Sequence, residues 1–437
     1  MGKKLKNESV ISIVKDDLCT GCGTCAAICP YHAIEMSENP RKHILLPTVK
    51  EEKCTNCGNC RRVCPGHEVD FKKLNAWIFG KRCTDNFNDI LLGYHIKSYS
   101  GYSRDFKVRY GSASGGLATE VLLFALRENL IDGALVTRMS KDRPLKPQPF
   151  IARTPKEIME SAGSKYCPVP ANEALEEILE EKGRYAVVGL PCHIHGIRKA
   201  EKVYEKLRKR IVLHLGIFCS HTDSLLETEY LLYKLKVNIT DVERIDYRGK
   251  GWPGMLSINL RSGRCIDVPF HDWIKIHAYC LFSPTRCLLC CDHCAELADI
   301  SFADAWLPEF LSDSVGTSIA VARSRIGDDI LHQAQSKGKI ELRELEDVKV
   351  AESQKMMRFK KNSIAVRFLL FNALGRKLPI YNTEILKPSY VDWPRSAIIF
   401  LNRYIAGKRS LWGSLESFAN LQNPLERMYK KALRFSS

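Results

Sequence analysis

The sequence predicts three parts: a small α+β module, an α/β domain with a largely parallel sheet, and a helical carboxyl-terminal tail. Residues 10–70 contain the same four-cysteine run twice. Between about 108 and 345, short apolar runs alternate with amphipathic stretches, which is typical of α/β domains. Beyond 350 the pattern becomes helical and basic. We therefore expect domains at 1–70, 108–350 and 351–437, with a connecting segment at 71–107.

The cysteine spacing of the first part is that of bacterial ferredoxins. The run C-x2-C-x2-C-x3-C-P occurs at 19–30 and again at 54–65. In this run three close thiolates hold one 4Fe-4S cluster and the fourth reaches across to the other cluster. We therefore expect a ferredoxin-like fold with two clusters and a short extended lead-in to each half, at 12–14 and 46–49. The first cluster is assigned to Cys19, Cys22, Cys25 and Cys64, and the second to Cys54, Cys57, Cys60 and Cys29.

Zinc is the competing interpretation of these cysteines, because CxxC pairs also bind tetrahedral zinc. Zinc sites do not call for a third close cysteine followed by Cys-Pro, and here that pattern occurs twice. Gly21, Gly23 and Gly58 suit loops whose backbone amides turn toward cluster sulfurs. The pattern therefore favours iron-sulfur clusters.

The α/β domain is predicted from strand-like runs that alternate with helical patterns. Apolar runs at 133–137, 185–190 and 211–218 are expected to be strands, and the stretches 117–129 and 172–181 are expected to be helices. This order favours parallel strands joined by helical crossovers.

The net charge and composition of the chain limit the classes of partner that it is expected to bind. The chain of 437 residues has 66 Lys and Arg against 50 Asp and Glu, a formal net charge of +16. Such a charge suits nucleic acid, an anionic membrane surface or an acidic ligand. No helix-turn-helix, zinc-finger or RNA-binding signature accompanies it, so nucleic acid is not expected.

Location is predicted from what the amino terminus and the tail contain. The first residues are polar and no run approaches the roughly 18 apolar residues of a membrane span, so we expect a cytoplasmic protein. Basic amphipathic helices are predicted at 396–409 and 425–434. They could pack on the core, dock a partner, or make peripheral contact with the cytoplasmic face of a membrane.

A second group of cysteines lies downstream. Cys192 and Cys219 each follow a strand-like run, which places them at the carboxyl end of the sheet, where open α/β folds bind ligands. Four more stand close together, at Cys287, Cys290, Cys291 and Cys294. A third cluster is favoured over zinc or over buried thiols, which are the usual fate of single cysteines. The lone Cys83 is expected to be a buried thiol.

A glycine- and serine-rich segment at 110–119 precedes a predicted helix. Its small residues would let backbone amides approach a phosphate at the helix amino terminus. A plain turn without a ligand is almost as compatible with the pattern, since glycine serves both.

Several short segments together resemble the beta subunits of coenzyme F420 hydrogenases and dehydrogenases. They are Gly111-Ser-Ala-Ser-Gly-Gly, Ala162-Gly-Ser-Lys-Tyr, Gly189-Leu-Pro-Cys-His, Gly216-Ile-Phe-Cys, Arg286-Cys-Leu-Leu-Cys-Cys-Asp and Ala298-Asp-Ile-Ser-Phe-Ala-Asp-Ala-Trp. The resemblance covers roughly 85–355. With the ferredoxin module in front, the chain looks most like the subunit that oxidises reduced coenzyme F420 in archaeal quinone- or phenazine-linked oxidoreductases.

The resemblance implies FAD in the α/β domain, a third 4Fe-4S cluster and coenzyme F420 as substrate. Carried over by motif, the cluster ligands are Cys192, Cys219, Cys287 and Cys290. The flavin-binding segments correspond to Ser112, Ser114, Gly115, Gly116, Thr119, Ser164, Lys165 and Tyr166, with Lys165 pairing a phosphate. The chain departs from the family at Ala303, where members usually have glycine, and in its additional thiols Cys291 and Cys294.

The implied function is a flavin and iron-sulfur oxidoreductase. It takes hydride from reduced coenzyme F420, or delivers hydride in reverse, and passes single electrons to a partner protein or membrane-bound redox complex. Two alternatives stay open: a ferredoxin-linked flavoenzyme that does not use coenzyme F420, and a non-catalytic iron-sulfur electron carrier.

Overall fold

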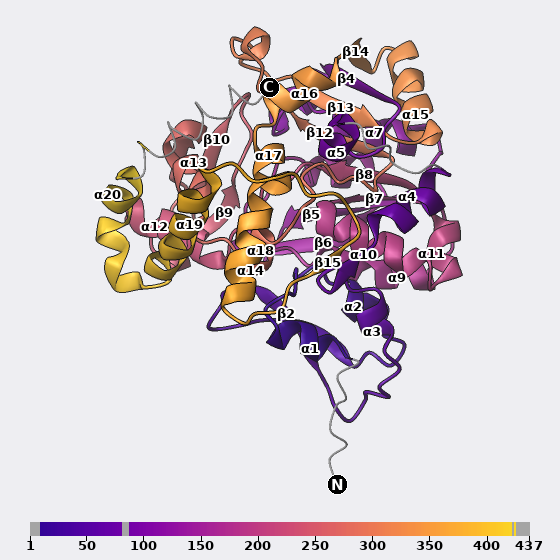
Figure 1. Ribbon diagram of the computed structural model, residues 1–437. Helices are drawn as coiled ribbons and strands as arrows, with labels where there is room; N and C mark the ends of the chain where they lie inside the picture. Colours follow the sequence, from indigo (N-terminus) through magenta and orange to yellow (C-terminus); the bar gives the residue numbers. More distant parts are fainter. Residues whose placement is uncertain (1–8, 81–86, 422–423, 425–437) are drawn as a thin grey trace.

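The computed structural model describes residues 9–80, 87–421 and 424 (Figure 1). As predicted, an amino-terminal module is followed by an α/β domain, and the chain beyond that domain is mainly helical. The amino-terminal module lies at one end of the α/β domain, and the last helices lie along its side. Cys83 and the helix predicted at 425–434 lie outside the described residues.

The module consists of two similar halves with one short helix each after the first cysteines. Its β1 and β2 pair antiparallel, and left-handed glycines, Gly23 with φ +85° and Gly58 with φ +75°, precede α2 and α3. The elements are α1 (Val10–Lys15), α2 (Thr24–Ala27), β1 (Ile34–Glu38), β2 (Leu45–Val49), α3 (Asn59–Arg62) and β3 (Glu68–Val69).

The extended lead-in predicted at 12–14 is wrong, because this segment forms α1. Ser9 caps the helix, accepting a hydrogen bond from the Ile11 amide at 3.4 Å. Val10 and Ile13, three residues apart, are both buried on one helix face. The other lead-in is extended as expected, since 46–49 lies within β2.

The segment 71–107, expected to be a connection, contains α4 (Phe71–Phe79), α5 (Phe87–Leu92) and β4 (Lys97–Ser103). Strand β4 lies inside the central sheet, between β14 and β13. It is built mainly of serine, glycine and tyrosine, and Ser98 and Ser100 are buried. Small hydroxyl residues at buried positions hide the apolar pattern by which a strand is recognised.

The central sheet has eight strands in the order β14-β4-β13-β12-β8-β7-β5-β6. Its middle strands β5, β7, β8 and β12 are parallel, as predicted, and antiparallel strands extend it at both edges. The other strands are β5 (Gly133–Met139), β6 (Pro147–Ala152), β7 (Tyr185–Gly189), β8 (Ile211–Ile217), β12 (Ile300–Asp304), β13 (Ser318–Ala322) and β14 (Ile340–Glu344).

Helices cover both faces of this sheet. Residues of α7 and α15 belong to the core on one face, and residues of α9, α10 and the module belong to the core on the other. The helices are α6 (Phe106–Gly111), α7 (Leu117–Arg127), α8 (Pro155–Glu160), α9 (Leu175–Glu180), α10 (Pro191–Glu201), α11 (Glu205–Arg210), α12 (Leu225–Lys234), α13 (Phe270–Ala278), α14 (Thr285–Leu288) and α15 (Arg325–Ser336), with 3-10 turns η1 (Ala171–Ala174), η2 (Ile239–Asp241) and η3 (Pro308–Phe310).

A smaller antiparallel sheet lies beside the domain, with β10 in the middle. Its strands are β9 (Val242–Asp246), β10 (Met255–Leu260) and β11 (Cys265–Pro269). The loop between β9 and β10 returns toward the glycine- and serine-rich segment, since the Gly251 amide donates to the Tyr110 carbonyl at 3.0 Å.

The tail is mainly helical, and it also contacts the module. Strand β15 pairs in parallel with β3 of the module. Its elements are α16 (Asp347–Ser353), α17 (Met356–Lys361), α18 (Ser363–Ala373), β15 (Ile380–Tyr381), α19 (Asp392–Ala406), η4 (Arg409–Ser414) and α20 (Leu415–Asn420). Among the described residues, no helix combines the length and the apolar character needed to cross a membrane.

Candidate functional site

The first predicted group of cysteines is brought together and buried. Burial raises the pKa of Cys25, and the thiols of Cys19, Cys22 and Cys64 raise it further. The Gly21 amide donates a hydrogen bond to the Cys19 sulfur at 3.4 Å. Such amide donors are expected in a loop that surrounds a cluster. Four converging sulfurs with amide donors fit a 4Fe-4S cluster.

The second predicted group lines one pocket, to which Cys29, Cys54, Cys57 and Cys60 all contribute. Burial raises the pKa of Cys60, with its neighbours Cys57 and Cys54 acting in the same direction. Cys57 is exposed. This set therefore also fits a cluster, but one that lies at the surface of the molecule.

The third group gathers where the parallel strands end. Cys192 lies in the first turn of α10 directly after β7, and Cys219 follows β8. Cys287 lies in α14, and Cys290 lies just beyond that helix. Burial raises the pKa of Cys192, and all three of these thiols, together with Cys22 of the first group, raise it further. Burial also raises the pKa of Cys219 to about 12.

Cys291 and Cys294 are held away from this group. The Cys294 sulfur lies 3.1 Å from the Met357 sulfur and 3.6 Å from the Leu91 carbonyl. Cys291 belongs to the apolar core on the module side of the sheet. Both are fully buried among side chains, which favours ordinary buried thiols at these two positions.

The first and third cysteine groups are neighbours. Cys22 lies close enough to Cys192 to raise its pKa. Asn172 joins the two segments, because its amide donates to the Thr24 hydroxyl at 2.7 Å and to the His193 carbonyl at 2.9 Å, and its backbone amide donates to the Cys22 carbonyl at 3.0 Å. Asn172 is completely buried, so this link is rigid.

The glycine- and serine-rich segment forms the turn between α6 and α7. Gly116, with φ +78°, immediately precedes α7, and Gly115 packs so closely that a Cβ there would lie 2.6 Å from the Gly101 carbonyl. The hydroxyls of Ser112 and Ser114 donate to backbone carbonyls at 2.7 Å. Thr119 lies in the first turn of α7 and is half-buried. The turn therefore brings its backbone close to neighbouring strands.

Lys165 is held within its own loop. Its Nζ donates to the carbonyls of Ala162 and Gly163 at 3.0 and 2.8 Å, and to that of Ser161. Burial lowers the pKa of Lys165 to about 8. An ammonium has three donors, so in this conformation none is left for a phosphate. Ser164 beside it is half-buried.

Arg248, which the sequence did not single out, joins the predicted flavin-binding segments. Its guanidinium donates to the Ala113 carbonyl in the glycine- and serine-rich turn and to the Tyr166 hydroxyl at 3.2 Å. It also lies 3.4 Å from Asp304 at the end of β12. It lies in the loop between β9 and β10, outside every recognised motif, so no signal in the sequence pointed to it.

Buried donors without acceptors surround this arginine. Among the described residues, the Nε of Arg248 and the indole nitrogens of Trp252 and Trp273 have no hydrogen-bond partner. Phe270 and Trp306 connect them. Arg248 lies over the Phe270 ring at 4.4 Å, and the Phe270 ring centroid lies 5.6 Å from that of Trp273. The Trp306 ring centroid lies 5.8 Å from that of Phe270 and 4.5 Å from that of Trp252. Because buried donors are normally paired, this aromatic region fits a flat ligand rich in acceptors, such as a flavin.

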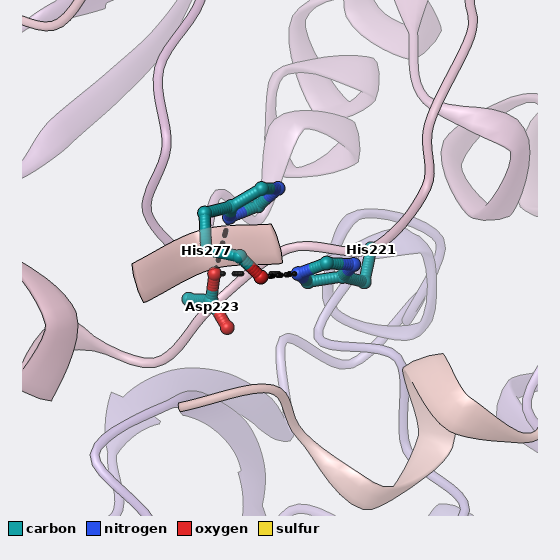
Figure 2. A group of neighbouring side chains, drawn as sticks. All are labelled: His221, Asp223 and His277. Atoms are coloured by element: carbon teal, nitrogen blue, oxygen red, sulfur yellow. Dashed lines mark hydrogen bonds and ion pairs between the residues drawn. The ribbon is translucent and has the colours of Figure 1, made fainter. Parts of the chain in front are cut away.

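His221, Asp223 and His277 form a buried polar cluster (Figure 2). His277 Nδ1 and the Ser283 hydroxyl donate to the Asp223 carboxylate, and His221 donates to the His277 carbonyl at 3.0 Å. Although burial acts in the opposite direction, Asp223 raises the pKa of His277 to about 9. His277 also packs edge-on against Tyr166.

The geometry of that cluster favours hydrogen bonding over metal binding. The rings of His221 and His277 are stacked, with centroids 4.0 Å apart and an interplanar angle of 18°. An imidazole binds a metal through a lone pair in its ring plane. Two nearly parallel stacked rings therefore cannot both direct a nitrogen at one ion without rotating.

Comparisons with known proteins agree with this arrangement. Residues 98–176 match the family described as coenzyme F420 hydrogenase/dehydrogenase, beta subunit N-term, and residues 182–348 match its carboxyl-terminal counterpart. Residues 18–67 match the 4Fe-4S dicluster domain. The three matches fall on the module and on the α/β domain that contains the third cysteine group.

The alignments with individual relatives extend over most of the length of each relative. The beta subunit of the coenzyme F420 hydrogenase of Methanothermobacter thermautotrophicus is 30% identical over 267 residues, 60% of this chain and 88% of the relative. The F subunit of the F420H2 dehydrogenase of Methanosarcina mazei is 25% identical over 319 residues, 70% of this chain and 82% of the relative.

A solved structure shows the same fold. A chain of the F420-reducing [NiFe] hydrogenase complex from Methanosarcina barkeri superposes with a TM-score of 0.51 at 23% identity, over 66% of this chain and 97% of that one. Together with the sequence matches, this establishes that the chain belongs to the family of coenzyme F420 hydrogenase/dehydrogenase beta subunits and carries a 4Fe-4S dicluster domain in front.

Proposed function

We propose that this chain is the subunit of an oxidoreductase that exchanges hydride with coenzyme F420 and exchanges single electrons with a partner protein. Relatives are named as F420 hydrogenase and F420H2 dehydrogenase subunits, which supports this substrate and a multi-subunit setting. The proposal includes FAD and three 4Fe-4S clusters. The observation that carries it is that the first and third cysteine groups are neighbours, because Asn172 donates both to the Cys22 carbonyl and to the carbonyl of His193, the residue after Cys192.

The proposed cluster ligands are those named from the sequence. Cys192, Cys219, Cys287 and Cys290 hold the inner cluster, and the two groups of the module hold the others. These side chains define a route that begins in the buried α/β domain, passes the buried first group and ends at the second group. Because Cys57 of the second group is exposed, electrons leave or enter the chain there.

FAD, when bound, supplies the conversion between two-electron hydride chemistry and the one-electron chemistry of clusters. Arg248 and the indoles of Trp252 and Trp273 are its proposed hydrogen-bond donors, because each has a buried nitrogen without an acceptor. The turn at Ser112, Ser114, Gly115 and Gly116 is proposed to border the same region, since Arg248 binds Ala113 within it. Arg248 is a better anion-binding candidate than Lys165, whose donors are all engaged.

Turnover of the coenzyme tests the proposed function. The protein would be purified without oxygen and reconstituted with iron and FAD, and the deazaflavin absorbance followed as reduced coenzyme F420 meets an artificial one-electron acceptor. FAD-dependent oxidation supports the proposal. Bound FAD without this turnover, but with activity toward reduced ferredoxin, would replace it by the ferredoxin-linked alternative, and clusters without flavin would indicate an electron carrier.

Iron counting tests the inner ligand set. We expect Cys290→Ser to lose about four of about twelve irons, since one cubane carries four. Cys294→Ser is the matched control from the same loop, and it should keep its iron because its sulfur faces Met357. Loss of iron from Cys294→Ser with retention by Cys290→Ser would overturn the assignment.

The tail is proposed to make peripheral contact with a membrane or with a membrane-bound partner. Helix α19 exposes Trp393, Leu401 and Tyr404, which are 46%, 48% and 64% exposed. Aromatic and apolar side chains beside basic ones are typical of interfacial helices. Co-sedimentation with anionic vesicles tests this: binding that Trp393→Ala with Leu401→Ala abolishes supports it, and absence of binding by the intact protein contradicts it.

A further inference from the structure

Lys360 is a buried cation with no carboxylate partner. It lies in α17 and is 2% exposed. Its Nζ donates to the Asp292 carbonyl at 3.0 Å. Within the described part of the chain, no carboxylate oxygen lies in ion-pair distance of this nitrogen. Its neighbour Lys361 differs, because the Lys361 ammonium pairs with Glu296 at 2.6 Å.

The negative charge that faces Lys360 comes mainly from the third cysteine group. The Cys290 sulfur lies 3.4 Å from the same Asp292 carbonyl oxygen to which the Lys360 ammonium donates, so these two groups are neighbours. Although burial opposes it, Cys290, Cys219 and Cys287, with a smaller contribution from the Asp292 carboxylate, raise the pKa of Lys360 above its ordinary value. In return, Lys360 acts to lower the pKa of Cys219 and of Cys287. A buried ammonium is costly unless an opposite charge compensates it. The Asp292 carboxylate is already engaged by His195 and by the backbone amides of Cys294 and Glu296, so the thiolates of the third group supply the main compensation.

We propose that Lys360 is the counter-charge of the inner 4Fe-4S cluster and raises the reduction potential of that cluster. The inference rests on the proposed ligands Cys192, Cys219, Cys287 and Cys290. Reduction adds one negative charge to a cluster, and a fixed positive charge nearby stabilises the reduced state, more strongly in a buried site than in water. Lys360 therefore sets the potential of the cluster closest to the flavin region.

Other charges near the site do not replace Lys360. Arg286 also lies near Cys290, but its guanidinium donates to the Leu289 and Pro65 carbonyls and its charge also faces Cys19 of the first group. Arg286 therefore acts on two clusters, whereas Lys360 faces three thiols of one. Lys360 also lies beyond 182–348, the part that matches the family, so the tail supplies it.

The experiment is a redox titration of the reconstituted holoprotein, followed by electron paramagnetic resonance. The inner-cluster signal is the one missing from Cys290→Ser. Lys360→Gln removes the charge and keeps a donor for the Asp292 carbonyl, while Lys360→Arg keeps the charge. We expect Lys360→Gln to favour the oxidised inner cluster at least tenfold, about 59 mV for a one-electron couple. Lys360→Arg and the two module clusters should stay near their wild-type potentials.

Any other outcome of this titration also decides whether the charge of Lys360 acts on the inner cluster. An unchanged inner potential in Lys360→Gln, or an equal shift in Lys360→Arg, overturns the proposal. If Lys360→Gln cannot hold the inner cluster but Lys360→Arg can, the charge is required for assembly and the proposal stands in stronger form. If neither holds it, Lys360 acts through packing and the proposal falls. A wild-type protein with only about eight irons would instead refute the third cluster itself.

Discussion

The two four-cysteine runs of the module have almost the same sequence but different surroundings. Cys22 and Cys25 of the first run are buried against the α/β domain, whereas Cys57 of the second run is exposed. The residues between the cysteines explain the difference. Buried Ala27 in α2 corresponds to exposed Arg62 in α3. The motif specifies the cluster, and the side chains around it specify which cluster faces the partner.

This difference assigns separate tasks to two similar sites. The first group lies beside the third, and the buried Asn172 joins the two segments, so the first group serves transfer inside the chain. The second group lines a surface pocket, so it serves transfer to another protein. If this view is correct, matched substitutions at equivalent positions of the two runs should have unequal effects.

The largest expected effect comes from removing one ligand in each run. Cys25→Ser and Cys57→Ser should each lose about four irons. Because Cys25 lies in the interface with the domain, its loss should also lower the free energy of unfolding by about 4 kcal/mol or more, the range of lost buried metal sites. Cys57→Ser should cost less than half as much. Iron analysis measures the loss of iron, and denaturant unfolding measures the loss of stability. Equal destabilisation by Cys25→Ser and Cys57→Ser would contradict the proposed difference between the buried and the exposed run.

The glycines before α2 and α3 form a second matched pair. Gly23 and Gly58 both have positive φ, so alanine at either site costs about 1–2 kcal/mol from backbone strain. At Gly23 a Cβ would also lie 2.8 Å from the Pro170 carbonyl and 2.9 Å from the Glu173 amide.

Overpacking against rigid backbone adds about 1–3 kcal/mol, so Gly23→Ala should be the more destabilising variant and should lose the first cluster before the second. Denaturant unfolding with iron analysis tests this. A Gly58→Ala variant as unstable as Gly23→Ala would show that the interface adds nothing at this position.

Much of this arrangement could be predicted from the sequence, where local patterns decide it. The cysteine runs bring Cys19, Cys22, Cys25 and Cys64 together as expected, because their spacing is imposed by the geometry of a cluster. The parallel strands could be recognised from their apolar runs, because most residues of these runs are buried.

What escaped prediction depends on tertiary contacts. Strand β4 pairs with β13 and β14, which lie far along the chain. Its serines are buried by these tertiary neighbours, and serines show no apolar pattern in the sequence. Arg248 reaches its site from the loop between β9 and β10, and Lys360 reaches its site from the tail; neither belongs to a motif. Lys165 stands in a recognised motif, yet the contacts that engage its ammonium are set by the turn of its own loop.

The smallest expected effect concerns Glu173, in η1 beside Gly23 of the first run. Burial raises the pKa of Glu173 from 4.5 to about 7, and the nearby carboxylates Glu176 and Glu35 add to it, while the Met36 amide opposes it. A raised carboxyl pKa means that the folded protein binds a proton that the unfolded chain has already lost between these values. This contribution to stability is therefore present at low pH and is lost as pH rises through about 7.

Because Glu173 is partly exposed, screening should limit the effect to about 1 kcal/mol. We expect Glu173→Gln to flatten the decline in unfolding free energy between about pH 5 and about pH 8, measured by denaturant titration. Glu180→Gln, at an exposed carboxylate ending α9, is the control and should keep the wild-type slope. Since Glu173 packs against Gly23 of the first run, raising the pH should weaken the buried cluster before the exposed one, which iron analysis across the same pH range measures. A slope unchanged by Glu173→Gln would place the pH dependence elsewhere and remove this asymmetry between the two runs.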